Sequence, residues 1–222
     1  MGLFDIFSGD TIEKYEYNPL LQEIPKKSTE IFKSCYKEDD EINIGITETM
    51  YAVIFALDFL TSVQNFKLSG NAKKALLNIS IKDTLCRMQN NYSFLTHFEL
   101  KQLYMVRKTY YNANIAKFSI PNNMIKRYEY NEKMDTTEEL LENPLISSLR
   151  GILFFYYLDL IVLYRERMPF SHGVDMNKYA FLLDDSYKEH IGYESQKIAD
   201  LIFKYAEPLS KDLIAIAKKP VD

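Results

Sequence analysis

Histidine is the residue type in this chain that first invites a search for metal chemistry. The sequence has three, His97, His172 and His190. A di-iron centre in a helical bundle needs an acidic residue three positions before a histidine, because residues three apart share one helix face. Phe, Pro and Tyr stand at those positions, and no His-Glu-x-x-His or Cys-x-x-Cys motif occurs. The sequence therefore predicts neither a metal site nor a cofactor.

The nearest approach to a metal site is Glu189, His190 and Glu194. His190 and Glu194 are four residues apart on an expected helix, so both side chains would face the same way. Two such side chains could both bind one metal ion. The same spacing also allows an ordinary hydrogen bond between the two side chains on the helix surface. We interpret the pair as the surface hydrogen bond.

A second pattern combines arginine with histidine at the end of an expected helix. Arg167 precedes His172 in an Arg-x4-His arrangement, and Arg165 precedes it in an Arg-x6-His arrangement. The pattern resembles the active-site motif of HEPN-type ribonucleases, which are small helical proteins that cleave RNA without a metal. The resemblance implies that His172 assists phosphodiester cleavage and that an arginine stabilises phosphate charge. The alternative is structural, because arginines favourably meet the dipole at a helix C-terminus.

Other reactive centres lack their characteristic residues. The chain has seven scattered glycines and neither of the glycine-rich motifs that hold nucleotide phosphates. No Gly-x-Ser-x-Gly elbow is present. Cys35 and Cys86 have no neighbouring histidine in the sequence, and a cysteine of this kind usually behaves as a small buried apolar residue. By elimination, a binding role is favoured over catalysis.

Acidic residues gather in three places that are candidate contacts for a partner protein. The net charge is −4, from 27 basic and 31 acidic residues, and acidic patches are suited to a partner with a basic surface. The candidate partner-binding residues are Glu38, Asp39, Asp40 and Glu41; Asp135, Glu138 and Glu139; and Asp184, Asp185 and Glu189.

The chain opens with the residues MGLFDIF. This opening resembles the first residues of many small bacterial cytoplasmic proteins, among them some toxin-immunity proteins. The resemblance implies a non-catalytic protein-binding module, such as an immunity protein or a defence-related inhibitor that acts by surface complementarity. Two alternatives stay open: a HEPN-like ribonuclease using Arg167 and His172, and a phage or structural assembly protein.

One segment of the chain combines basic residues with tyrosines, as some nucleic-acid-binding proteins do. Residues 101–133 contain seven basic and two acidic residues, interleaved with tyrosines, and such mixtures grip single-stranded nucleic acid by charge and stacking. Several of these tyrosines fall on the predicted core stripe of their helix, however. A solvated basic face is the preferred interpretation, so nucleic acid is not the expected partner.

Glycine and proline are scarce, with seven of each in 222 residues, which favours long helices over a fold with many turns. We predict an all-α, irregular bundle of seven to eight helices around two very hydrophobic central helices at 47–66 and 144–167. An N-terminal arm, residues 1–24, would pack on a single helical domain, residues 25–222. The other expected helices span 25–37, 72–90, 96–114, 136–142, 177–183 and 186–206, with a last helix after Pro208.

The most apolar stretch is Ile152–Tyr164, thirteen residues that include Asp159. A bilayer-spanning helix needs about 20 predominantly apolar residues, so a buried core helix is the better interpretation and no membrane span is expected. The N-terminus lacks the pattern of a secretory signal, and the two cysteines form no close-spaced pair. Together these features predict a cytoplasmic protein.

Overall fold

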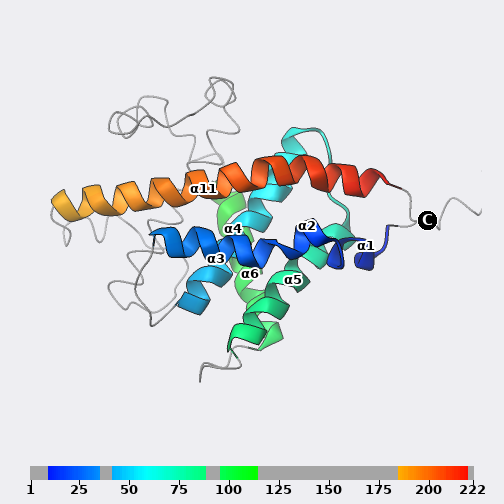
Figure 1. The fold of residues 1–222 in the computed structure, drawn as a ribbon, viewed down its shortest axis with the longest axis horizontal. Coiled ribbons are helices and arrows are strands. Elements are labelled where there is room, and N and C mark those ends of the chain that lie inside the picture. The colour runs from blue at the N-terminus through cyan, green and yellow to red at the C-terminus, as the bar shows by residue number, and fades with distance from the viewer. Residues whose placement is uncertain (1–9, 36–41, 89–95, 115–184, 220–222) are drawn as a thin grey trace, which may run out of the picture.

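The computed structural model describes residues 10–35, 42–88, 96–114 and 185–219, and within these ranges every regular element is a helix. The predicted all-α class is confirmed for this part of the chain (Figure 1). The helices are α1 (Ile12–Glu16), α2 (Pro19–Gln22), α3 (Ile24–Cys35), α4 (Ile42–Val63), α5 (Gly70–Met88), α6 (His97–Asn114) and α11 (Asp185–Lys218).

The predicted N-terminal arm contains two short helices. Thr11 caps α1 by accepting a hydrogen bond from the backbone N–H of Lys14. Asn18 caps α2 in the same way, and Pro19 stands at the first helical position, where its missing N–H is not needed. Helix α1 packs along α5. The proposed division of the chain after residue 24 stays a prediction.

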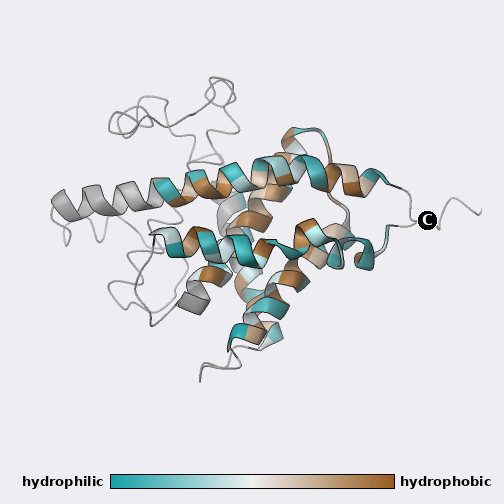
Figure 2. Cartoon of the chain, viewed as in Figure 1, coloured by the Kyte–Doolittle hydropathy of each residue, from teal (hydrophilic) through white to brown (hydrophobic). Residues whose placement is uncertain are grey.

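Helix α4 is the buried helix at the centre of the described structure. The sequence predicted a central helix at 47–66, and Met50 through Leu57 are each at most 5% exposed. Helices α3, α5 and α11 pack around it, and Figure 2 shows the hydropathy of the packed helices. Residues 45–63 of α4 are long and apolar enough to cross a membrane, but 78% of the 18-residue window is buried within the fold, as in a core helix.

Helices α5 and α6 each begin at a side chain that accepts a hydrogen bond from a free backbone N–H of the first turn. Ser69 accepts a hydrogen bond from the N–H of Ala72 at 3.1 Å. Thr96 and Glu99 form a capping box: the Glu99 N–H donates to Thr96 Oγ1 at 3.2 Å, and the Thr96 N–H donates to Glu99 Oε2 at 2.7 Å. The hydrogen bonds from Thr96 hold the pKa of Glu99 below its ordinary value. Helix α6 is described as far as Asn114.

One prediction is wrong at Pro208. The sequence predicted that this proline breaks or kinks its helix and that a separate last helix follows. The break and the separate helix are contradicted, because α11 is a single helix of 34 residues with Pro208 inside it. Buried apolar residues lie on both sides of the proline, including Ile202 before it and Leu213 after it. Their burial against the neighbouring helices (Figure 1) outweighs the local cost of a lost backbone hydrogen bond.

The second predicted central helix, 144–167, lies outside the described residues, as do the short helices predicted at 136–142 and 177–183. The description of the core therefore rests on α4 and the helices around it.

Candidate functional site

Most residues singled out by the sequence lie outside the part of the chain that the structure describes. Asp185 and Glu189 belong to the first turns of α11, but the described part does not include their side chains. The residues outside the described ranges are Arg165, Arg167 and His172; Glu38, Asp39, Asp40 and Glu41; Asp135, Glu138 and Glu139; and Asp184. Both the ribonuclease motif and the acidic patches therefore stay predictions.

The described residues do contain an open groove, with a volume of about 420 Å³, between α3 and α5. Each long wall is a helical stripe, because Pro25, Lys26 and Thr29 recur at a spacing of three to four, as do Ile79, Lys82, Asp83 and Cys86. Helices α1 and α2 line the rest of the groove. The lining residues from there are Glu16, Tyr17 and Gln22.

One of these lining residues is a buried carboxylate. Glu16 is 8% exposed, and its Oε1 accepts a hydrogen bond from Asn78 Nδ2 at 2.6 Å while its Oε2 lies 3.3 Å from Lys82 Nζ. The hydrogen bond from Asn78 and the charge of Lys82 lower the pKa of Glu16 against the opposing effect of burial. The carboxylate is thus held in its charged form by groups of α5.

The remaining charges of the groove are also balanced within the chain. Asp83 accepts a hydrogen bond from Arg87 Nε at 2.6 Å, and Lys26 Nζ lies 3.9 Å from Glu23. Tyr17 also lines the groove, and unlike the buried Glu16 it is 73% exposed. An exposed aromatic ring next to a concave surface is a feature of sites that bind other molecules.

The prediction that Cys86 is buried is wrong. The sequence favoured a buried cysteine on the apolar stripe of its helix, but Cys86 is exposed and lines the groove as a free thiol. Leu76, which the sequence placed on the same stripe, is buried, and so is Thr84, whose hydroxyl contacts Thr47 of α4. The misassignment arose because α5 is covered on more than one side, so its apolar residues do not mark a single face.

A buried ion pair joins α4 to α6. Arg107 Nε lies 3.0 Å from Glu48 Oε1 and 3.1 Å from Glu48 Oε2, and the two side chains are 5% and 0% exposed. Arg107 stands at helical spacing from Leu100 and Tyr104, and all three residues are buried on the same side of α6. Nearby, the Tyr51 hydroxyl donates to the Leu100 carbonyl at 2.8 Å, and Tyr51 meets Tyr104 edge to face. These contacts fix α6 on the core.

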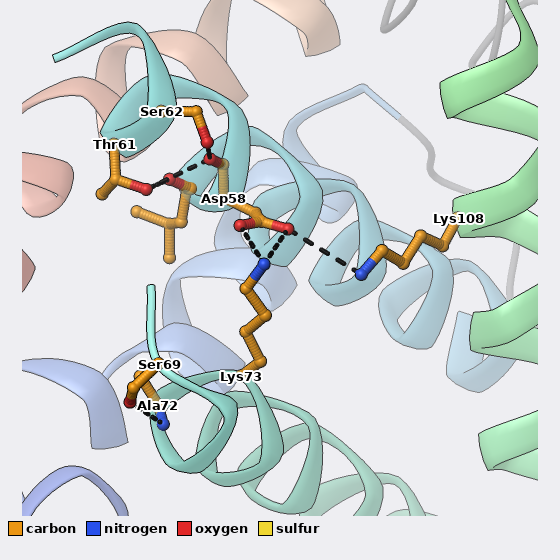
Figure 3. Close-up of polar contacts among 8 residues, drawn as sticks. Asp58, Thr61, Ser62, Ser69, Ala72, Lys73 and Lys108 are labelled. Carbon is orange, nitrogen blue, oxygen red and sulfur yellow. Dashed lines mark hydrogen bonds and ion pairs between the residues drawn. The ribbon is translucent and has the colours of Figure 1, made fainter. Parts of the chain in front are cut away.

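A second ionic contact joins α4, α5 and α6 nearer the surface. Figure 3 shows Lys73 and Lys108 converging on Asp58, with N–O distances of 2.8 Å and 3.8 Å. In the described portion of the basic segment, Lys101 is exposed, whereas Arg107 is buried and Lys108 is about one third exposed. The predicted solvated basic face is therefore smaller in this part of the segment, because Arg107 and Lys108 are paired with acidic residues of α4.

The described residues contain no group of three or more histidine, cysteine or acidic side chains that is arranged to hold a metal ion. Comparisons of the chain with family models, curated proteins and solved structures find no match. The groove is the candidate site that the sequence analysis missed. The sequence signal for the groove is the helical spacing of polar residues on each of two helices. The sequence does not show that these two rows of residues face each other, because that requires knowing that α3 packs on α5.

Proposed function

We propose that this chain is a non-catalytic protein-binding module and that the groove between α3 and α5 is one of its contact surfaces. The observation that carries the proposal is Tyr17, a largely exposed aromatic residue at the edge of a concave surface. Tyrosine is enriched among the residues that dominate binding energy at protein interfaces, because it offers a large apolar ring and a hydroxyl together. Apolar lining comes from Pro25 and Ile79.

The charges of the groove support binding by shape and do not point to a reaction. The two lining carboxylates, Glu16 and Asp83, are each in contact with a cation of the chain. A general acid needs a proton to donate at the working pH, whereas the hydrogen bond from Asn78 lowers the pKa of Glu16 and so favours its ionised form. The groove thus offers a partner apolar lining from Pro25 and Ile79 together with polar side chains such as Gln22 and Thr29.

The finer proposal concerns the kind of partner. With a net charge of −4, the chain is suited to a partner with a basic surface, which the acidic residues Glu38–Glu41, Asp135–Glu139 and Asp184–Glu189 would meet. We propose a bacterial immunity protein or a defence-related inhibitor as the class. This part of the proposal rests on composition and on the opening residues of the chain.

The test compares proteins captured by the tagged full-length chain in cells of its source organism, quantified by mass spectrometry. Tyr17→Ala is expected to reduce recovery of the partner at least tenfold, because truncating an interface hot spot costs about 2 kcal/mol or more. Phe98→Ala is the matched control, since Phe98 is also exposed (66%) but lies on α6, outside the groove. Circular dichroism of both variants excludes a loss of fold.

Three outcomes would contradict the proposal in different ways. An equal effect of Tyr17→Ala and Phe98→Ala would remove the groove as the contact surface. Full recovery of the partner after charge reversal at Glu38–Glu41, Asp135–Glu139 and Asp184–Glu189 would remove the acidic patches. Cleavage of RNA by the purified chain, abolished by His172→Ala, would replace the binding function with catalysis.

A further inference from the structure

No further inference is drawn: the strongest candidate beyond the groove, the surface patch on α6 where Phe98 and Met105 are exposed, carries nothing because no feature of the structure shows what covers it.

Discussion

At the scale of single residues, polar groups in the interior decide how the helices fit together. Glu48 and Arg107 are nearly inaccessible to water, and each compensates the charge of the other. Thr47 and Thr84 form a similar link between α4 and α5, with 2.9 Å between their hydroxyl oxygens. Such groups are costly to bury alone, so each one restricts the packing to arrangements in which its partner is present.

The ion pair can be tested by removing one of its members. Arg107→Met is expected to lower the free energy of unfolding by about 3–5 kcal/mol, because the charge of Glu48 stays buried without its partner. Lys101→Met is the matched control on the same helix, since Lys101 is exposed, and it should change stability by less than about 0.5 kcal/mol. Urea denaturation measures both, and similar values for the two variants would contradict a role for the buried pair.

Gly45 is a second residue with a strict steric role. A Cβ atom built at this position would overlap the ring of Phe32, so the absence of a side chain lets α3 approach α4. Gly45→Ala should destabilise the protein by about 1–3 kcal/mol through overpacking, despite the better helix propensity of alanine.

Gly70→Ala provides the comparison for Gly45, because no neighbouring atom lies within 4 Å of a Cβ built at Gly70. Thermal unfolding of the two variants measures the difference. In the double variant, the smaller side chain introduced by Phe32→Leu should recover part of the stability that Gly45→Ala loses. If it does not, the loss of stability in Gly45→Ala does not arise at the contact with Phe32.

At the scale of elements, helix ends and helix interiors follow different rules. The ends obey local chemistry, as the capping box of Thr96 and Glu99 shows. The last turn of α11 is an exception, because Lys14 of α1 donates to the carbonyls of Ala217 and Lys219 across the fold. Interiors obey packing, which is why α11 continues through Pro208.

Pro208→Ala tests this balance in α11. Pro208 is exposed, so the substitution removes little packing. Alanine restores a backbone N–H and removes the ring that crowds the preceding turn, which should stabilise the protein by about 1–3 kcal/mol. Thermal unfolding monitored by circular dichroism measures the change. An unchanged or lower melting temperature would mean that the helix gains nothing from a regular backbone at this point.

At the scale of the whole molecule, the described helices share one core around α4, and this core includes several tyrosines. Tyr15, Tyr51 and Tyr104 are all buried in it. Burial raises the pKa of each hydroxyl, because a phenolate would lose its hydration there. For Tyr15, whose hydroxyl donates to Asp10 at 2.6 Å, the pKa rises from 10.0 to about 12. The folded chain therefore favours the protonated tyrosines.

This burial predicts a loss of stability in alkali. Because the pKa of Tyr15 is higher in the folded state than in the unfolded state, its contribution is fully present below pH 10 and is lost as the pH rises toward about 12. Urea denaturation at a series of pH values, with phenolate absorbance as a second signal, measures this slope. Tyr15→Phe should flatten the slope in this window, and an identical slope in the variant would contradict the assignment.

For the described residues, the sequence by itself determined the class of fold, the presence of the central helix and the beginnings of α5 and α6 to within two residues, although α4 already includes Ile42, five positions before its predicted start. These follow from local rules: an apolar run such as Met50–Leu57 must be buried, and a capping box such as Thr96–Glu99 satisfies backbone groups within a few residues. The position of Arg107 on a core stripe was also predictable from helical spacing, although its partner Glu48 was not.

Only the tertiary structure decided the groove, the exposure of Cys86 and the continuity of α11 through Pro208. Each depends on which helix faces which, and this is set by the sum of many contacts between residues distant in the sequence. Glu16 and Lys82 illustrate the point, because 66 positions separate two residues that meet at 3.3 Å. No local pattern of apolar or polar residues encodes such a pairing, because helical periodicity fixes the faces of one helix but not the neighbour that each face meets.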